Sequence, residues 1–261
     1  MYQEILYSRH ERSGGVFAEI RLNRPAKGNA ITFGMLESLA DIARELAGDP
    51  TVGVVVLRGE GKFFCTGGDI AEWSALSPAG MHDRWILRGL EVLQAIASLP
   101  QPVIAAINGH ALGGGLELAM HADLRLAEQS ALFGTPEVKL GMVAGWGGVR
   151  RLAETVGVSR AQHLTLLGDP VTAQQAHEWG LITAVAKGPA EFDALLEQWI
   201  ARLLANSGTA MTLTKGLLAG GHQDFRNEHA DAAAHAIGTP DCAEGVKAFL
   251  EKRPPVFRRQ P

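Results

Sequence analysis

The stretch PVIAAINGHALGGGLELAMHAD, residues 102–123, decides the fold of this chain. Its apolar run Val103–Ile107 lies between a proline and an Asn-Gly pair, which is typical of a short buried strand that ends in a turn. Three glycines at 113–115 follow, and good helix formers occupy Leu116–His121. A strand, a glycine turn and a helix start leave backbone N–H groups unpaired at the positive end of a helix dipole. The stretch therefore predicts an anion site.

Glu117 stands three residues after Gly114 in this stretch. At 3.6 residues per turn it lies about one turn along the predicted helix and roughly 60° around it from Gly114. The Glu117 carboxylate and the Gly114 amide can therefore face one reacting atom.

Strand-like and helical segments alternate on the N-terminal side of this stretch. Residues 2–9 and 16–22 alternate apolar and polar side chains around a Ser-Gly-Gly turn, which predicts a hairpin of half-exposed strands. Phe33–Leu46 has apolar residues at helical spacing, and the almost wholly apolar Val52–Leu57 is typical of a strand buried on both faces. The order strand, helix, strand predicts crossover connections and an α/β fold.

The second half of the chain is expected to be mainly helical. Short strands are expected at residues 124–127, 131–133 and 181–186, and helices at 159–167, 173–179, 190–205, 211–218, 227–237 and 241–252. We therefore predict two parts, an α/β core over residues 1–200 and a helical C-terminal region over residues 201–261.

The composition argues against several classes of function. A formal charge of −4, a pI of about 6.1 and no run of basic residues longer than two argue against a nucleic-acid partner. No apolar stretch approaches ~18 residues and the first residues are mixed polar, so we expect no membrane partner and a cytoplasmic location. Cys65 and Cys242 are too few for a disulfide scaffold, and we expect both to be small packed side chains.

Common catalytic motifs are missing from the sequence. It has no G-x-S-x-G, no H-E-x-x-H, no P-loop and no G-x-G-x-x-G after a strand, and its nine histidines have no metal-ligand spacing. We therefore expect neither a metal nor a redox cofactor. Two glycine-rich turns remain, at Thr66–Asp69 and at residues 113–115, and each follows strand-like sequence.

Three ordered motifs resemble one known family. FFCTGGDI begins at residue 63, INGHALGGGLELAMHADLRLA at 107 and LFGTPEVKLGMVAGWGGVRRL at 132, and together they resemble the crotonase, or enoyl-CoA hydratase/isomerase, superfamily. The resemblance covers almost the whole chain, from about residue 21 to about residue 253. It implies a spiral core of repeated ββα units, with a helical C-terminal part that forms trimers or hexamers built as dimers of trimers. It also implies an acyl-CoA substrate, with coenzyme A entering as part of that substrate rather than as a cofactor.

The resemblance assigns the two glycine turns to an oxyanion hole. It implies that the backbone N–H groups of Gly68 and Gly114 hold the thioester oxygen of the substrate. Reactions at the carbons beside a thioester carbonyl put negative charge on that oxygen, and donors already aimed at it stabilise the transition state more than the substrate.

Two glutamates match the acid–base groups of the hydratases within this superfamily. The resemblance implies that Glu117 holds and activates water and that Glu137 transfers a proton at C2, because hydration requires both steps. Isomerases often lack one of the two glutamates, so their joint presence favours hydration over isomerisation, C–C cleavage or decarboxylation.

An RNA-binding or structural relative is disfavoured, because residues 33–47, where its basic helix is expected, carry more acids than bases. Without the resemblance, the sequence favours another interpretation, in which Glu117 is a helix-start glutamate stabilised by the helix dipole and Glu137 is a solvated loop glutamate.

The resemblance also implies residues that bind the acyl-CoA. A loop containing Ala26 and Lys27 is expected to contact the adenine and phosphates, although the family usually has a larger residue in place of Gly28. The other matching positions are Gly67 and Asp69 in the first turn, Ile70 and Trp73 beside the acyl pocket, and Phe249 and Lys252, which are expected to reach coenzyme A from a neighbouring subunit.

Trp146 departs most from the family pattern. Many hydratases have a proline and smaller residues where this chain has Ala144 and Trp146. Trp73, Trp85 and Trp146 either line an aromatic acyl pocket or belong to the core, and the sequence leaves both alternatives open. The first alternative predicts a bulky or cyclic acyl group.

Overall fold

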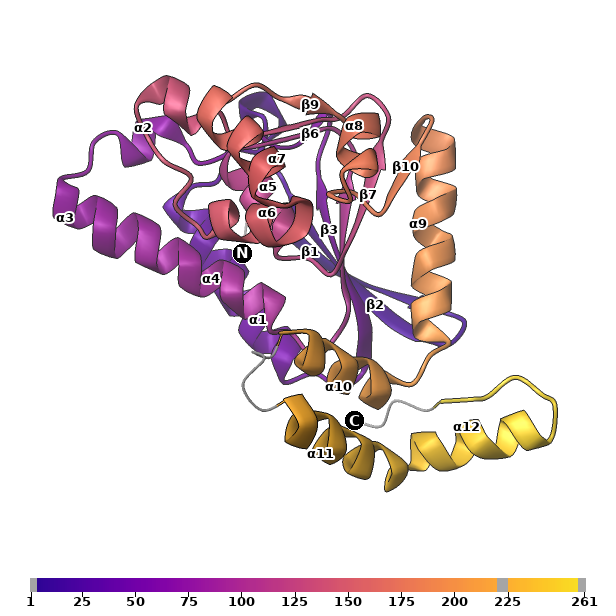
Figure 1. Ribbon diagram of the computed structural model, residues 1–261. Coiled ribbons are helices and arrows are strands. Elements are labelled where there is room, and N and C mark those ends of the chain that lie inside the picture. Colours follow the sequence, from indigo (N-terminus) through magenta and orange to yellow (C-terminus); the bar gives the residue numbers. More distant parts are fainter. Residues whose placement is uncertain (1–3, 220–224, 258–261) are drawn as a thin grey trace.

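The computed structural model describes residues 4–219 and 225–257 and contains two β-sheets surrounded by helices (Figure 1). The large sheet consists, in order, of β1 (Ile5–Arg12), β2 (Gly15–Leu22), β3 (Val52–Gly59), β5 (Val103–Ile107), β7 (Leu124–Glu128) and β10 (Ala184–Ala186). The small sheet consists of β4 (Phe63–Cys65), β6 (His110–Leu112), β8 (Leu132–Gly134) and β9 (Val171–Thr172). The first predicted strand begins at Ile5 in the described residues, and its residues 2 and 3 lie outside them.

The helices follow or separate these strands. In the first half they are α1 (Phe33–Ala47), α2 (Ile70–Trp73), α3 (Pro78–Gly80), the π-helical η2 (Met81–Leu87), α4 (Arg88–Ala97) and α5 (Gly114–Met120). In the second half they are α6 (Gly148–Val156), α7 (Val158–Gln162), the π-helical η4 (His163–Leu167), α8 (Ala173–Glu178), α9 (Pro189–Leu204), α10 (Gly208–Ala219), α11 (Phe225–Ile237) and α12 (Pro240–Leu250). No helix in the described part of the chain is both long and apolar enough to cross a membrane.

Successive strand pairs alternate between the two sheets. β3, β5 and β7 lie side by side and parallel in the large sheet, while β4, β6 and β8, which follow them in the chain, lie parallel in the small sheet. Helices follow each pair and return the chain to the next strand. The predicted α/β fold of repeated ββα units that wind as a spiral is therefore confirmed.

Alternate residues of β3 face two different hydrophobic layers. Val55 and Leu57 pack in a cluster with buried residues of α1 and α4, and Val54 and Val56 pack in a second cluster with buried residues of α9. This alternation is the two-residue period of a strand, and it explains why a strand covered on both faces is apolar throughout. Figure 1 shows α9 on one side of the large sheet and α1 and α4 on the other. The large sheet is thus the rigid layer behind the site.

The structure differs from the sequence predictions in several elements, and it adds the short strands β4, β6 and β9, which were not predicted. The strand expected at 181–186 is only the three residues of β10, and α6 was not predicted. α6 begins at Gly148, directly after the N-cap residue Gly147, and glycine has low helix propensity, so no local signal marks its start. The predicted division near residue 200 stays a prediction; α9 continues to Leu204, and its residues Ile200 and Leu204 are buried against the large sheet.

Candidate active site

The carboxyl ends of β4 and β6 bring the two glycine turns together. These strands are parallel neighbours, so the turns that follow them leave the same edge of the small sheet. An ideal Cβ on Gly114 would lie 3.5 Å from the Gly68 nitrogen, so the two backbones are almost in contact. The pairing of the two turns predicted from the sequence is present in the structure.

The Gly68 and Gly114 amides are free to bind a ligand. Ile31 forms a parallel bridge with Gly68, in which the Ile31 N–H donates to the Gly67 carbonyl and the Asp69 N–H donates to the Ile31 carbonyl, both at 2.8 Å. The Gly68 N–H therefore points away from Ile31. Gly114 is the first residue of α5, where an N–H has no partner within the helix. Neither N–H donates a hydrogen bond to another residue in the described ranges 4–219 and 225–257.

Glu117 is buried on α5, one turn beyond Gly114. Its Oε1 accepts hydrogen bonds of 2.8 Å from the N–H groups of Trp146 and Gly148, at the start of α6, where the helix dipole favours a negative charge. Burial raises the pKa of this carboxyl to about 7, helped by the negative charge of Glu137 and opposed by backbone hydrogen bonds from Gly148, Trp146 and Gly145. Glu117 therefore gains and loses a proton near neutral pH.

Glu137 lies in the 3-10 helix η3 (Pro136–Leu140), close to the turn before α5. A Cβ on Gly113 would lie 2.8 Å from its Oε1, and its Oε2 is buried without a hydrogen-bond partner among the described residues. Burial raises the pKa of this carboxyl. A half-buried carboxyl with one unpaired oxygen beside two free amides is suited to proton transfer.

These groups line one pocket of about 60 Å³. The residues around it are Gly68, Trp73, Trp85, Ile86, Gly114, Glu117, Glu137, Leu140, Met142, Val143, Gly145 and Trp146. Trp85 and Trp146 are also buried members of the hydrophobic core, so both alternatives left open by the sequence hold for these two tryptophans. The sequence did not identify the N–H donors of Trp146 and Gly148, nor the lining by Ile86, Met142 and Val143. The glycines around Trp146 were the one signal in the sequence that backbone N–H groups of this segment could act as donors.

The loop predicted to contact coenzyme A lies beside the first glycine turn. Ala26 and Lys27 are exposed in the short 3-10 helix η1 (Pro25–Lys27), and the Thr66 N–H donates to the Gly28 carbonyl at 3.0 Å. Gly28 has a φ of 60°, and a Cβ there would lie 2.7 Å from the Thr66 Cγ2, which explains why this chain lacks the larger residue.

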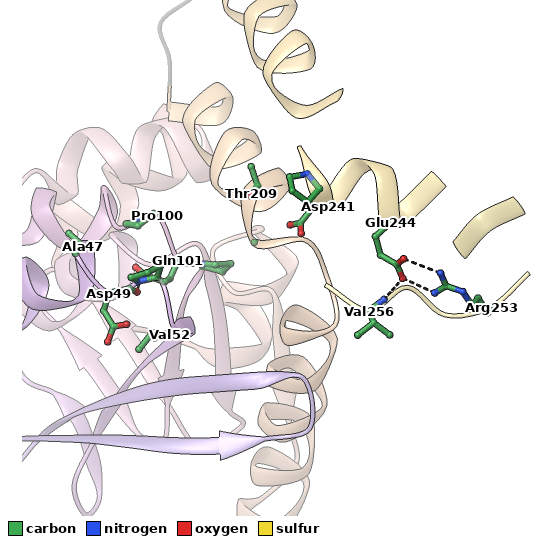
Figure 2. A pocket seen from close by; sticks show the side chains of 15 residues that line it. Ala47, Asp49, Val52, Pro100, Gln101, Thr209, Asp241, Glu244, Arg253 and Val256 are labelled. Atoms are coloured by element: carbon green, nitrogen blue, oxygen red, sulfur yellow. Dashed lines mark hydrogen bonds and ion pairs between the residues drawn. The ribbon is translucent and has the colours of Figure 1, made fainter. Parts of the chain in front are cut away.

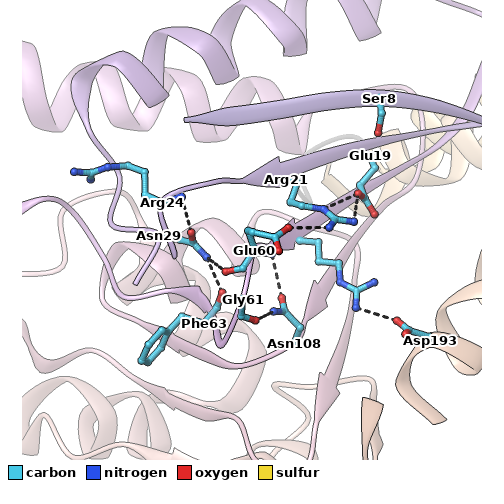
Figure 3. Close-up of polar contacts among 12 residues, drawn as sticks. Ser8, Glu19, Arg21, Arg24, Asn29, Glu60, Gly61, Phe63, Asn108 and Asp193 are labelled. Carbon is cyan, nitrogen blue, oxygen red and sulfur yellow. Dashed lines mark hydrogen bonds and ion pairs between the residues drawn. The ribbon is translucent and has the colours of Figure 1, made fainter. Parts of the chain in front are cut away.

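Asn29 holds this loop in place. Its side chain accepts a hydrogen bond from the Arg24 N–H and donates to the carbonyls of Glu60 and Phe63 (Figure 3). Because Asn29 is fully buried, these bonds fix the start of the loop against the segment that leads into β4.

Asp69 and Ile70 complete the first turn without lining the pocket. Asp69 accepts from the Ala71 N–H at 3.0 Å and pairs with Arg24 at 2.9 Å. Burial raises the pKa of Asp69, but Arg24 outweighs that effect and holds the pKa below its usual value. Ile70 is 52% exposed. Their predicted contacts with the substrate stay predictions.

Cys65 and the predicted C-terminal residues lie outside the pocket. Burial raises the pKa of the Cys65 thiol to about 12, which agrees with its predicted role as a packed side chain. Phe249, on α12, and Lys252, just after it, lie far from α5 in the same chain (Figure 1). Their predicted contact with coenzyme A in a neighbouring subunit stays a prediction.

Comparison with known proteins identifies the family of this chain. The model of the enoyl-CoA hydratase/isomerase family matches residues 11–260. A crotonyl-CoA hydratase of Syntrophomonas wolfei is 36% identical over 257 residues, covering 97% of this chain and 96% of its own. A mevalonyl-coenzyme A hydratase of Beauveria bassiana is 35% identical over 254 residues, covering 92% and 90%. The crystal structure of an enoyl-CoA hydratase from Bacillus anthracis superposes with a TM-score of 0.90 at 31% identity, covering 99% of this chain and 100% of that one. The chain belongs to the enoyl-CoA hydratase/isomerase family.

Proposed function

We propose that the protein adds water across the 2,3 double bond of an enoyl-CoA thioester to give 3-hydroxyacyl-CoA, and catalyses the reverse dehydration. One observation supports this proposal above the others: two free amides and two carboxyls line the same pocket. Coenzyme A enters this reaction as part of the substrate.

The two amides provide the site for the thioester oxygen. Attack of water at C3 moves electrons through C2 to that oxygen, which becomes enolate-like. The N–H groups of Gly68 and Gly114 are held by the backbone and need no rearrangement to meet this charge, so they stabilise the transition state more than the substrate.

The two carboxyls divide the proton transfers. Glu117, whose Oε1 accepts from the Trp146 and Gly148 N–H groups, accepts a hydrogen bond from water through its carboxylate and takes the proton of that water as the oxygen bonds to C3. Glu137 in its protonated form delivers a proton to C2 from the unpaired side of its carboxyl. Burial raises the pKa of both groups, that of Glu117 to about 7, so the pair can hold one proton near neutral pH.

Incubation with trans-2-enoyl-CoA thioesters tests this reaction. We expect the enoyl-thioester absorbance to fall and 3-hydroxyacyl-CoA to accumulate. A 3-enoyl-CoA product instead would show isomerisation, which needs only one carboxyl to move a proton between C2 and C4. Chain-shortened products would show C–C cleavage, and failure to change any enoyl-CoA would overturn the proposal.

We also propose that the C-terminal helices join the subunits into a trimer or a dimer of trimers. Large apolar side chains on α10, α11 and α12 are exposed, among them Leu218 at 83%, Ile237 at 76% and Phe249 at 82%. Exposed apolar surface of this kind marks association. A groove of about 1040 Å³ also lies between the start of α12 and the core residues around Gln101 (Figure 2).

The mass of the protein in solution tests this assembly. We expect light scattering after size-exclusion chromatography to give three or six times the mass of one chain. Replacing Phe249 and Leu218 together by serine is expected to shift the protein toward the monomer, and a wild-type monomer would contradict the proposal.

A further inference from the structure

Two indole rings stand directly against the two free amides. A Cβ on Gly68 would lie 2.5 Å from Trp85 Cζ2, and a Cβ on Gly114 would lie 2.6 Å from Trp146 Cζ3. The rings contact each other with centroids 5.1 Å apart at 46°. The pocket wall beside both amides is therefore formed by Trp85 and Trp146.

This wall is held rigidly. The Trp146 Nε1–H donates to the Trp85 carbonyl at 3.0 Å, and Gly89 is the residue whose missing side chain makes room for the Trp146 indole. Trp85 in turn packs edge-on against Phe33, with ring centroids 5.0 Å apart at 80°. Trp146 is 2% exposed and Trp85 5%. Swinging Trp146 aside would break a buried hydrogen bond and leave its N–H without a partner, which is costly.

The space in front of this wall is small. The pocket measures about 60 Å³, whereas an apolar cavity that binds benzene measures about 150 Å³. By that ratio, only about two or three carbon atoms fit between the amides, the carboxyls and the two indoles. The two tryptophans leave little room beside the amides, so this wall argues against the bulky or cyclic acyl group predicted from the sequence.

We infer that the acyl group is short, up to about four carbons long including the thioester carbonyl carbon, and that Trp146, braced by Trp85, sets this limit. This inference rests on the proposed function and names the substrate class for that site. The sequence relatives do not decide it, because a crotonyl-CoA hydratase and a mevalonyl-coenzyme A hydratase are almost equally similar to this chain, at 36% and 35% identity.

The test compares kcat/KM for trans-2-enoyl-CoAs of four, six and eight carbons and for cinnamoyl-CoA. One methylene that a pocket cannot hold changes discrimination by about 10-fold or more, so we expect the six-carbon substrate to be at least about 100-fold poorer than crotonyl-CoA. Trp146→Ala is expected to raise kcat/KM for the eight-carbon substrate at least about tenfold. Trp146→Phe, which keeps one ring and is the gentler change, is expected to give a smaller rise in the same direction.

A distant tryptophan supplies the matched control. Trp199 on α9 packs in the hydrophobic cluster on the other face of the large sheet, so Trp199→Ala is expected to keep the wild-type ratio of eight-carbon to four-carbon turnover. The same shift in Trp199→Ala, or equal wild-type turnover of four- and eight-carbon substrates, would overturn the size limit while leaving the proposed hydration intact.

Binding measured without turnover separates the two proposals. Calorimetry with butyryl-CoA and octanoyl-CoA is expected to show tighter binding of butyryl-CoA to the wild type and a gain for octanoyl-CoA in Trp146→Ala. If no enoyl-CoA is hydrated, the proposed function fails, and this comparison still decides the size limit. Octanoyl-CoA binding the wild type as tightly as butyryl-CoA would refute it.

Discussion

Gly114→Pro lowers kcat for enoyl-CoA hydration by about 100- to 1,000-fold relative to Gly114→Ala, which is the expected result of deleting one oxyanion donor. Proline removes the N–H, and it is tolerated at the first position of a helix, where Gly114 stands. The backbone bonds of α5 are kept, because the Gly114 N–H has no acceptor in the described residues. The loss corresponds to about 2.7–4 kcal/mol of transition-state stabilisation.

Alanine at the same position is the matched control. Both variants add a Cβ that meets Trp146 Cζ3, so that clash affects both, whereas proline alone lacks the N–H and places a ring carbon where the N–H pointed. Making the pair in a Trp146→Ala background removes that clash, and we expect the difference between proline and alanine to persist there. Circular dichroism and thermal unfolding check that both chains fold. Equal kcat values for the folded pair would mean that the Gly114 N–H does not stabilise the reaction.

The strand before the site was predictable because its signal is local. Val103–Ile107 is an uninterrupted apolar run between residues that break regular structure, and β5 has those bounds. The small sheet was not predictable in the same way. β4 and β6 have three residues each and β9 has two, which is too short for any periodicity, and they exist because of parallel pairing with segments far along the chain.

The site also combines features that the sequence predicts with features that only the packing determines. Gly68, Gly114, Glu117 and Glu137 were predicted together because each stands in a motif of the family, and the structure places all four around one pocket. The position of Trp146 depended on packing that no motif records. Its N–H binds Glu117 while its indole fills the pocket, and both depend on how the segment before α6 lies against α4 and α5. The sequence therefore suggested the chemistry of the site, whereas the size of the pocket could be found only from the structure.

Glu117→Gln is expected to lower kcat for hydration by about 100- to 10,000-fold, the range for loss of a general acid or base. The amide keeps an oxygen to accept from the Trp146 and Gly148 N–H groups, so the local backbone is preserved. It has no basic oxygen that can take a proton from water. Glu137→Gln is expected to fall in the same range, because its amide cannot deliver a proton to C2. Near wild-type kcat in both variants would exclude the two-carboxyl mechanism.

The same Glu117→Gln variant is expected to be more stable than the wild type at pH 8. Burial raises the pKa of Glu117 from 4.5 to about 7, so the folded state binds this proton more tightly than the unfolded state. Stability is therefore lost as pH rises from about 4.5, and the loss is complete above about pH 7, where it amounts to about 3 kcal/mol. Glutamine carries no charge and avoids this cost, so the variants should unfold together at pH 4.5 and separate by several degrees at pH 8. A lower melting temperature for Glu117→Gln at pH 8 would show that the buried charge is stabilising. The expected gain instead means that an ionisable carboxyl is kept at this position for proton transfer, at the expense of the fold.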